Sequence, residues 1–156
     1  MTKPIPEGYH NATPALTVKG APEAIEFYKK AFGAKEIYRF AGPDGKSIMH
    51  AEIKIGDSII MLGEENPQMG MLSPLSTGST GSGIFLYVPD ADDVFNRAVS
   101  AGAKPQMPMM DAFWGDRYGS ITDPFGHIWS ISTRKKDMTL DEISKAGQEV
   151  FKNMCK

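Results

Sequence analysis

The chain has 156 residues, 41% of them hydrophobic and 23% charged, a composition typical of one globular domain with a sizeable core. Its formal net charge is -2 and no block of basic residues stands out, which argues against nucleic acid as a partner. No apolar run approaches the length of a membrane span, and the first ten residues lack the apolar core of a signal peptide. With a single cysteine, Cys155, these features predict a cytoplasmic protein without internal disulfides, in which Cys155 is a tail residue without chemistry.

The first half of the chain predicts a strand, a helix and three further strands. An extended run over 13–20 precedes a helix over 21–34, in which apolar residues recur at helical spacing and Gly33 provides the stop. Strands follow within 35–40, 47–56 and 57–63, and Pro43 and Gly45 provide the turn between the first two. This order defines one βαβββ unit.

The second half repeats this order at a nearly constant offset, which matches Val18 with Val88 and Gly33 with Gly102. A strand over 83–90 and a helix over 91–103 precede strands within 104–115, 117–123 and 127–133. Two copies are too few for a solenoid. The repeat therefore predicts one α+β domain over 1–137, built from module one at about 8–64, a linker at 65–82 and module two at 83–137.

The linker and the C-terminal segment leave alternatives open. The linker is rich in Gly, Ser, Thr and Pro and is either a lid over a pocket or, as we favour, a plain connector. The segment 138–156 is predicted to be helical, because Thr139 and Glu142 match a capping box. Its apolar stripe consists of Ile143, Ala146, Val150 and Met154. This helix packs either on its own domain or on a second subunit.

Three stretches carry a family resemblance: "TPALTVKGAPEAIEFYKKAFGA", "MHAEIKIGDSIIML" and "FWGDRYGSITDPFGHIWSI". The chain resembles the vicinal-oxygen-chelate superfamily over about residues 8–137, and within it the PhnB-like branch of glyoxalase/bleomycin-resistance-type proteins. The resemblance implies that each module curls its sheet into half of a cup and that helices cover the convex backs. The concave faces would form a pocket within one chain or across a homodimer. Because the fold hosts lyases, epimerases, dioxygenases and binding proteins, the activity stays open.

The resemblance also implies metal ligands on the first and last strand of each module. Carried over to this chain, those positions are Thr13, Ile60 or Met61, Gly83 and Ser130. Neutral hydroxyls, a glycine and an aliphatic or thioether side chain do not build a site for a hard cation. We therefore expect the scaffold without its usual metal and without another cofactor, although a divalent metal held elsewhere is not excluded.

Alternation along the strands separates core residues from concave-face residues. In strand 47–56 the predicted core residues are Met49, Ala51, Ile53 and Ile55, and the predicted concave residues are His50, Glu52 and Lys54. The predicted ligand-binding set is Thr13, Thr17, Phe85, Tyr87 and Ser130, with Trp114, Arg117 and Tyr118 at the rim. Aromatic walls with a few polar groups are typical of small-molecule sites, where Arg117 would pair with an anion. The alternative for the rim is a packed turn with an Asp116–Arg117 surface pair.

His50 and Glu52 are the candidate catalytic residues. Two positions apart on one strand, they point the same way, so the carboxylate can orient the imidazole as a general base. They are alternatively two ligands of a displaced divalent metal, with His10 or Glu64 as the third, or a structural polar pair.

Other residues have simpler expected roles. We expect His127 to be exposed, and we expect Asp123, Pro124 and Gly126 to form a turn without catalytic function. Glu64 and Glu65 are expected to be a solvated pair. The residues Met107, Met109 and Met110 are expected to serve core or dimer packing, or to form an adaptable pocket wall.

Three functions follow from these patterns. The first is a metal-free homodimer that binds a small, partly aromatic molecule in its concave cup. The second is a metal-dependent lyase or dioxygenase-type enzyme that uses His50 and Glu52. The third is a dimer with a vestigial cup whose role is to bind another protein.

Overall fold

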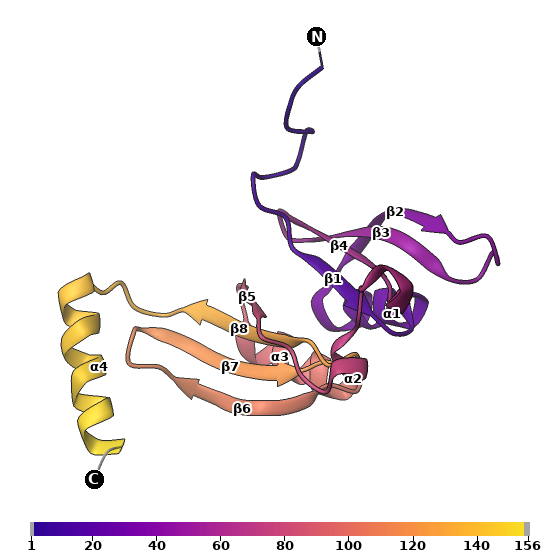
Figure 1. Ribbon diagram of the computed structural model, residues 1–156. Coiled ribbons are helices and arrows are strands. Elements are labelled where there is room, and N and C mark those ends of the chain that lie inside the picture. The colour runs from indigo at the N-terminus through magenta and orange to yellow at the C-terminus, as the bar shows by residue number, and fades with distance from the viewer. Residues whose placement is uncertain (1, 155–156) are drawn as a thin grey trace.

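The computed structural model describes residues 2–154 and contains two four-stranded sheets in the predicted order (Figure 1). Module one consists of β1 (Ala15–Val18), α1 (Ala21–Phe32), β2 (Lys35–Ala41), β3 (Ile48–Ile55) and β4 (Ser58–Glu64). Module two consists of β5 (Gly83–Tyr87), α3 (Ala91–Ser100), β6 (Lys104–Asp111), β7 (Asp116–Thr122) and β8 (Ile128–Arg134). The duplicated βαβββ architecture of the α+β class is therefore confirmed, whereas the expectation for Cys155 lies outside the described residues.

Both sheets share one topology, β1-β4-β3-β2 and β5-β8-β7-β6. The first and last strands of each module pair in parallel, and the other neighbours are antiparallel. The register aligns Ala15 with Met61 and Phe85 with Ser130. Met61 lies opposite Glu52 and so shares its face, whereas Ile60 is buried in the core. The concave position of β4 is therefore Met61.

The predicted alternation in β3 holds except at its start. Ala51, Ile53 and Ile55 are buried as expected. Met49 is 41% exposed, and Ile48 takes the core position instead. The cause is an irregularity in the β2–β3 pairing, where Phe40 opposes His50 but Ala41 opposes Ile48, so one residue is skipped. The prediction that Met49 belongs to the core is wrong for this reason.

The end of β4 closes module one by capping α1. Glu64 accepts hydrogen bonds from the backbone N–H groups of Gly20 (2.7 Å) and Ala21 (2.8 Å), which lack partners within the helix. Glu65 accepts from the amide and the hydroxyl of Ser73 and from the hydroxyl of Ser76. These bonds, led by those from the serine side chains, lower the pKa of Glu65 to about 2. The predicted solvated pair is therefore wrong, because both carboxylates are hydrogen-bonded.

The linker is an ordered connector. It contains a 3-10 turn, η1 (Pro67–Met69), and the short helix α2 (Pro74–Thr77). Ser73 is fully buried, and Pro74 packs so closely on Gly126 that a Cβ there would lie 2.8 Å from the proline ring. This packing against the β7–β8 turn favours the connector over the lid.

The C-terminal helix α4 (Leu140–Met154) stands at the end of the second sheet, away from the first (Figure 1). The predicted capping box is confirmed: the Thr139 amide donates to Glu142 Oε2 (2.7 Å) and the Glu142 amide to Thr139 Oγ1 (3.3 Å). The helix docks through Gly147, against the Phe113 ring, and through Phe151. Val150 and Met154, the last members of the predicted stripe, are exposed in the single chain, so they do not pack on their own domain, and the alternative of a second subunit stays a prediction. No helix within residues 2–154 is long and apolar enough to cross a membrane.

The two modules are joined at a buried carboxylate. Asp123, in the β7–β8 turn, accepts from the Tyr28 hydroxyl of α1 (2.8 Å) and from Trp129 Nε1 (2.8 Å). Its other oxygen accepts from the amides of Phe125 and His127 (both 2.9 Å). The His127 ring is buried and bonds the Thr17 carbonyl through Nε2 (2.9 Å). The expected exposure of His127 is wrong, because this turn is folded against α1 and β1 of the other module.

We predict that Tyr28→Phe destabilises the protein by about 1–3 kcal/mol, the cost of leaving a buried acceptor short of a donor. Burial, and then the Asp123 charge, raises the pKa of Tyr28 well above its ordinary value of 10.0. Above pH 10 the tyrosine of the unfolded chain ionises while folded Tyr28 stays neutral. The contribution of the Tyr28–Asp123 hydrogen bond to the free energy of unfolding is therefore lost as pH rises. Between pH 8 and pH 10.5, chemical denaturation should show a larger fall in the free energy of unfolding for the wild type than for Tyr28→Phe. Equal falls would contradict the role given to the Tyr28 hydroxyl.

Candidate functional site

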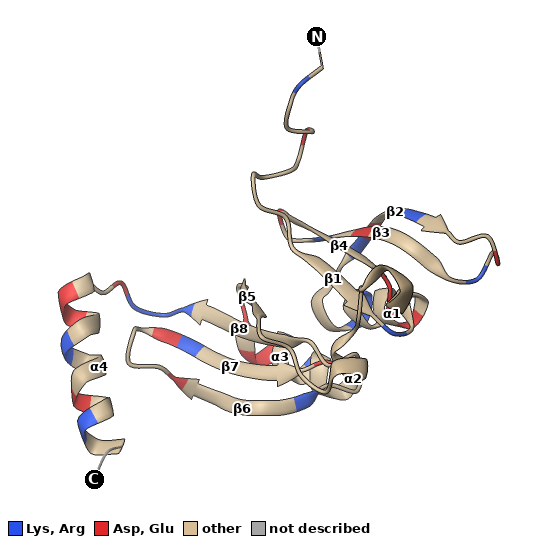
Figure 2. Ribbon diagram, viewed as in Figure 1, with Lys and Arg blue, Asp and Glu red and all other residues tan. Residues whose placement is uncertain are grey.

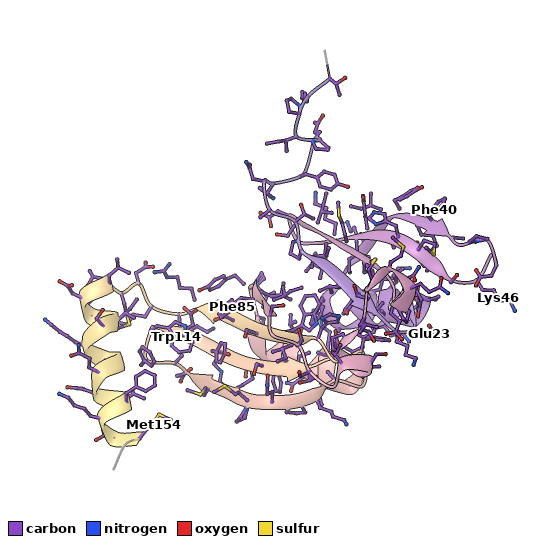
Figure 3. All side chains as sticks on the ribbon, in the orientation of Figure 1. Glu23, Phe40, Lys46, Phe85, Trp114 and Met154 are labelled. Carbon is purple, nitrogen blue, oxygen red and sulfur yellow. The ribbon has the colours of Figure 1, made fainter. Side chains whose placement is uncertain are left out.

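An aromatic row covers the face of the second sheet that lies opposite α3. Phe85 and Tyr87 are 47% and 67% exposed, and their ring centroids are 5.1 Å apart. Tyr118 stacks beside Phe85 at 5.8 Å, and Trp114 meets Tyr118 edge-on at 5.2 Å. Figure 3 shows Phe85 and Trp114 on the second module. The structure thus brings four predicted ligand-binding residues together, from β5, β7 and the turn before β7.

Polar groups lie among and beneath these rings. The Tyr118 hydroxyl is 3.2 Å from Ser130 Oγ. Buried Asp116 accepts from Trp114 Nε1 (3.0 Å) and from the Ser132 hydroxyl (2.9 Å). Local desolvation of the hydroxyl, followed by the charge and hydrogen bond of Asp116, raises the pKa of Tyr87. Asp116 is therefore a fixed support of the aromatic row, and the alternative of a surface Asp116–Arg117 pair is wrong.

Arg117 lies on the opposite face of the second sheet. Its Nε and Nη2 donate to the two oxygens of Asp92, both at 2.9 Å, and Nη1 lies 3.4 Å from Asp111. The hydrogen bonds to Asp92 raise the pKa of Arg117. Alternation from buried Asp116 turns residue 117 toward the start of α3, where Asp92 lies. The predicted position of Arg117 at the concave rim is wrong, and its charge is already paired.

The first sheet carries a cluster of three titratable side chains on the face opposite α1. His50 Nε2 lies 3.1 Å from Glu52 Oε1, and the Tyr9 hydroxyl donates to Glu52 Oε2. These bonds, Tyr9 first, lower the pKa of Glu52, and the same carboxylate raises the pKa of Tyr9. Tyr9 was not predicted, because the segment before β1 has no periodicity that would indicate its direction.

Two half-exposed aromatic side chains flank this cluster from β2. Tyr38 lies directly opposite Glu52, and Phe40 lies opposite His50. Directly opposed residues point to the same side of a sheet. In Figure 3, Phe40 is seen on the outer part of the first sheet. The first sheet therefore has its own aromatic and polar surface.

A small pocket lies where the two modules adjoin. It has a volume of 260 Å³ and is lined by His10 and Thr13 before β1, by Ile60 of β4 and by Phe85 of β5, among others. Thr13 is thereby brought beside Phe85. Thr17 is half-buried, and its carbonyl is engaged by His127. His10 contributes to this pocket and not to the His50 cluster.

The methionines of β6 divide between the two sides of the second sheet. Met109 packs against the core, whereas Met107 and Met110 are exposed. Met107 pairs with Ser120 and Met110 with Tyr118, so both extend the apolar face that carries the aromatic row.

The residues at the four positions where metal enzymes of the resembled superfamily hold their ion do not suit a metal in this chain. Those positions offer Thr13, the Met61 thioether, the side-chain-free Gly83 and Ser130, whose hydroxyl is already engaged by Tyr118. A hard divalent cation prefers carboxylate and other oxygen ligands, and imidazole suits softer metals. Within residues 2–154, no three His, Cys, Asp or Glu side chains are grouped to hold a metal ion.

Among residues 2–154, charge marks no further candidate surface. Figure 2 shows basic segments spread over both modules and α4 rather than gathered in one block. This distribution agrees with the low net charge of -2. We take the aromatic row and the Tyr9–Glu52–His50 cluster as the candidate sites, because each groups residues that can bind or react.

Comparisons with known proteins agree with this architecture. The family model of the Glyoxalase/Bleomycin resistance protein/Dioxygenase superfamily matches residues 11–131. An uncharacterized protein of Mycobacterium tuberculosis is 44% identical over 137 residues, 86% of this chain and 80% of that protein. Protein PA1353 from Pseudomonas aeruginosa has a crystal structure with 25% identity and a TM-score of 0.66, covering 81% of this chain and 99% of its own. A PhnB protein from Bacillus cereus shares the fold at 16% identity, with a TM-score of 0.63 over 80% of this chain and 99% of that one. The chain therefore belongs to the glyoxalase/bleomycin resistance protein/dioxygenase superfamily.

Proposed function

We propose that this protein binds a small, partly aromatic molecule against the aromatic row of its second sheet, without a metal. The observation that carries the proposal is the aromatic row, in which exposed Phe85 and Tyr87 continue into half-buried Tyr118 and Trp114. Asp116 and Ser130 hold the last two through hydrogen bonds. Exposed aromatic patches of this kind mark binding surfaces more often than chance, and planar ligands gain from stacking on them.

A second copy of the chain would complete the cup. Small-molecule sites are typically about 300–1,000 Å³, and the pocket that places Thr13 beside Phe85 has only 260 Å³. Both concave faces carry exposed apolar side chains, including Tyr38 and Phe40 on the first sheet and Tyr87 and Met110 on the second. Covering them with a second subunit would remove this apolar surface from water and enclose a ligand.

The metal-dependent enzyme is the weaker alternative. Its third ligand was expected to be His10 or Glu64, but His10 lines the intermodule pocket and Glu64 caps α1. The His50–Glu52 pair is therefore the one geometric feature among residues 2–154 that supports a metal-dependent enzyme.

We predict that 8-anilinonaphthalene-1-sulfonate, used as a planar aromatic probe, binds the folded protein and quenches tryptophan fluorescence through Trp114. Trp129 is fully buried, so a response that disappears in Trp114→Phe locates the probe. Tyr87→Ala and Trp114→Ala should each raise the probe Kd roughly threefold to tenfold, the equivalent of about 0.5–1.5 kcal/mol for an aromatic contact. Met69→Ala, an exposed apolar change in the linker, is the matched control. Unchanged affinity in both aromatic variants would remove this site.

We predict that the purified protein contains no stoichiometric divalent metal, because the four positions offer no suitable ligand set. Elemental analysis for Ni, Zn, Fe, Mn and Mg should find trace amounts, and EDTA should leave the melting temperature unchanged. Near-stoichiometric metal together with a melting temperature lowered by EDTA would contradict the prediction and restore the metal enzyme.

We predict a homodimer whose mass in light scattering is twice the 17.0 kDa of one chain. Phe40→Glu, on the concave face of the first sheet, should shift the protein to monomer because it would bury an unpaired charge. Leu140→Glu changes a highly exposed residue at the start of α4 and tests the other candidate surface. Dissociation by Leu140→Glu alone would assign the interface to α4 and leave the concave faces uncovered.

A further inference from the structure

The Tyr9–Glu52–His50 cluster has the connectivity of a positioned general base. Each Glu52 oxygen has its own donor, Tyr9 on Oε2 and His50 Nε2 on Oε1. The donors hold the carboxylate from two sides, so its position is fixed. Tyr9 belongs to the segment before β1, which is thereby tied to β3.

This arrangement selects one tautomer of His50. Glu52 is an ionised acceptor, because its hydrogen bonds lower its pKa. The ring nitrogen that faces a carboxylate carries the hydrogen, so neutral His50 has Nε2–H and a lone pair on Nδ1. In the described chain, the bond to Glu52 is the one hydrogen bond that the His50 ring makes. The His50 side chain is 40% exposed, so a ligand on this face can reach it.

The surroundings suit a planar substrate. Phe40 and Tyr38 lie opposite His50 and Glu52, and the Tyr38 ring centroid is 6.4 Å from the imidazole. Lys54 continues the same face of β3 and supplies a positive charge that can attract an electron-rich group. All these groups belong to the first module and its leading segment, so the site does not depend on the aromatic row of the second sheet.

We propose that His50 is a catalytic general base that removes a proton from a planar carbon acid, with Glu52 and Tyr9 as positioning residues. The substrate class is a compound with a C–H bond next to an electron-withdrawing group. In the step, Nδ1 forms a bond to the hydrogen, the C–H electron pair passes into the substrate, and the imidazolium later returns its proton to water. No oxidant, reductant or metal takes part.

The test uses 5-nitrobenzisoxazole, whose ring opens when a base removes its C3 hydrogen. The C3–H pair forms the nitrile, the N–O bond breaks, and its electron pair stays on the phenolate oxygen, which is followed by absorbance. A positioned base contributes about 10²–10⁴-fold, and for this unselected probe we expect His50→Gln to lose at least about tenfold. We also expect the wild type to exceed free imidazole at equal concentration. Equal rates for wild type and His50→Gln would overturn the proposal.

The positioning role has a readout that does not depend on turnover. Two-bond ¹H–¹⁵N correlation spectra should show His50 of the wild type in the Nε2–H form. Glu52→Gln should mix the tautomers and lower the rate, and Tyr9→Phe should have the same effects to a smaller extent. Glu149→Gln, which removes an exposed carboxylate on α4, is the matched control and should change neither. A wild-type spectrum with Nδ1–H would refute the assigned geometry even if a variant failed to fold.

This proposal and the binding proposal fail separately. His50→Gln should keep its affinity for 8-anilinonaphthalene-1-sulfonate, because the probe contacts the second sheet. Tyr87→Ala should lose probe affinity and keep the His50 tautomer. If His50→Gln loses proton abstraction and keeps its affinity for the probe, the result supports His50 as the base and leaves the binding proposal to be judged by Tyr87→Ala.

Discussion

Four donors converge on the carboxylate of Asp123, and one of them, the Tyr28 hydroxyl, comes from the other module. A buried carboxylate that keeps all four partners is stable, whereas losing any of them leaves an acceptor without water to replace it. The Tyr28 ring also packs on Trp129, with centroids 5.2 Å apart, so the hydrogen bond and the aromatic core form one unit. The orientation of module two against α1 depends on this unit.

The same junction decides which surfaces stay open. Because α1 and α3 pack on each other and α1 receives the β7–β8 turn, each module turns its helix toward the junction. The other face of each sheet is left to water in a single chain, and on these faces the aromatic row and the Tyr9–Glu52–His50 cluster lie. Exposure of these faces is thus a consequence of how the core is built, and it is the condition for binding a ligand or a second subunit.

Period-two alternation predicted much of the site from the sequence, because it depends only on local strand geometry. It placed His50 with Glu52, and Phe85 with Tyr87 and Ser130, on faces without a helix. It failed at Met49, where a skipped residue in the β2–β3 pairing shifts the pattern. Arg117 was misplaced for another reason: it was assigned to the rim together with its neighbours, although alternation turns it toward Asp92 on the other face.

The alternation pattern could not predict contacts between segments that are distant in the sequence. The roles of Tyr9 and His127 rest on bonds to Glu52 and to the Thr17 carbonyl, partners far away in the chain. Glu64 was expected in solvent because the residues next to it in the sequence do not indicate that its partner is the start of α1. Local periodicity gives the direction of a side chain, but tertiary packing decides what that side chain meets.

The two modules share one backbone plan and carry different chemistry on it. Their registers align Met61 with Ser130, and from these positions Glu52 corresponds to Ser120 and His50 to Tyr118. The first copy therefore has an imidazole and a carboxylate where the second has an aromatic ring and a hydroxyl. An imidazole held by a carboxylate suits proton transfer, whereas rings supported by buried Asp116 suit stacking. Because neither set contains the other's partners, a change on one face should leave the hydrogen bonds of the other intact, so that binding and proton transfer are separable properties of one duplicated scaffold.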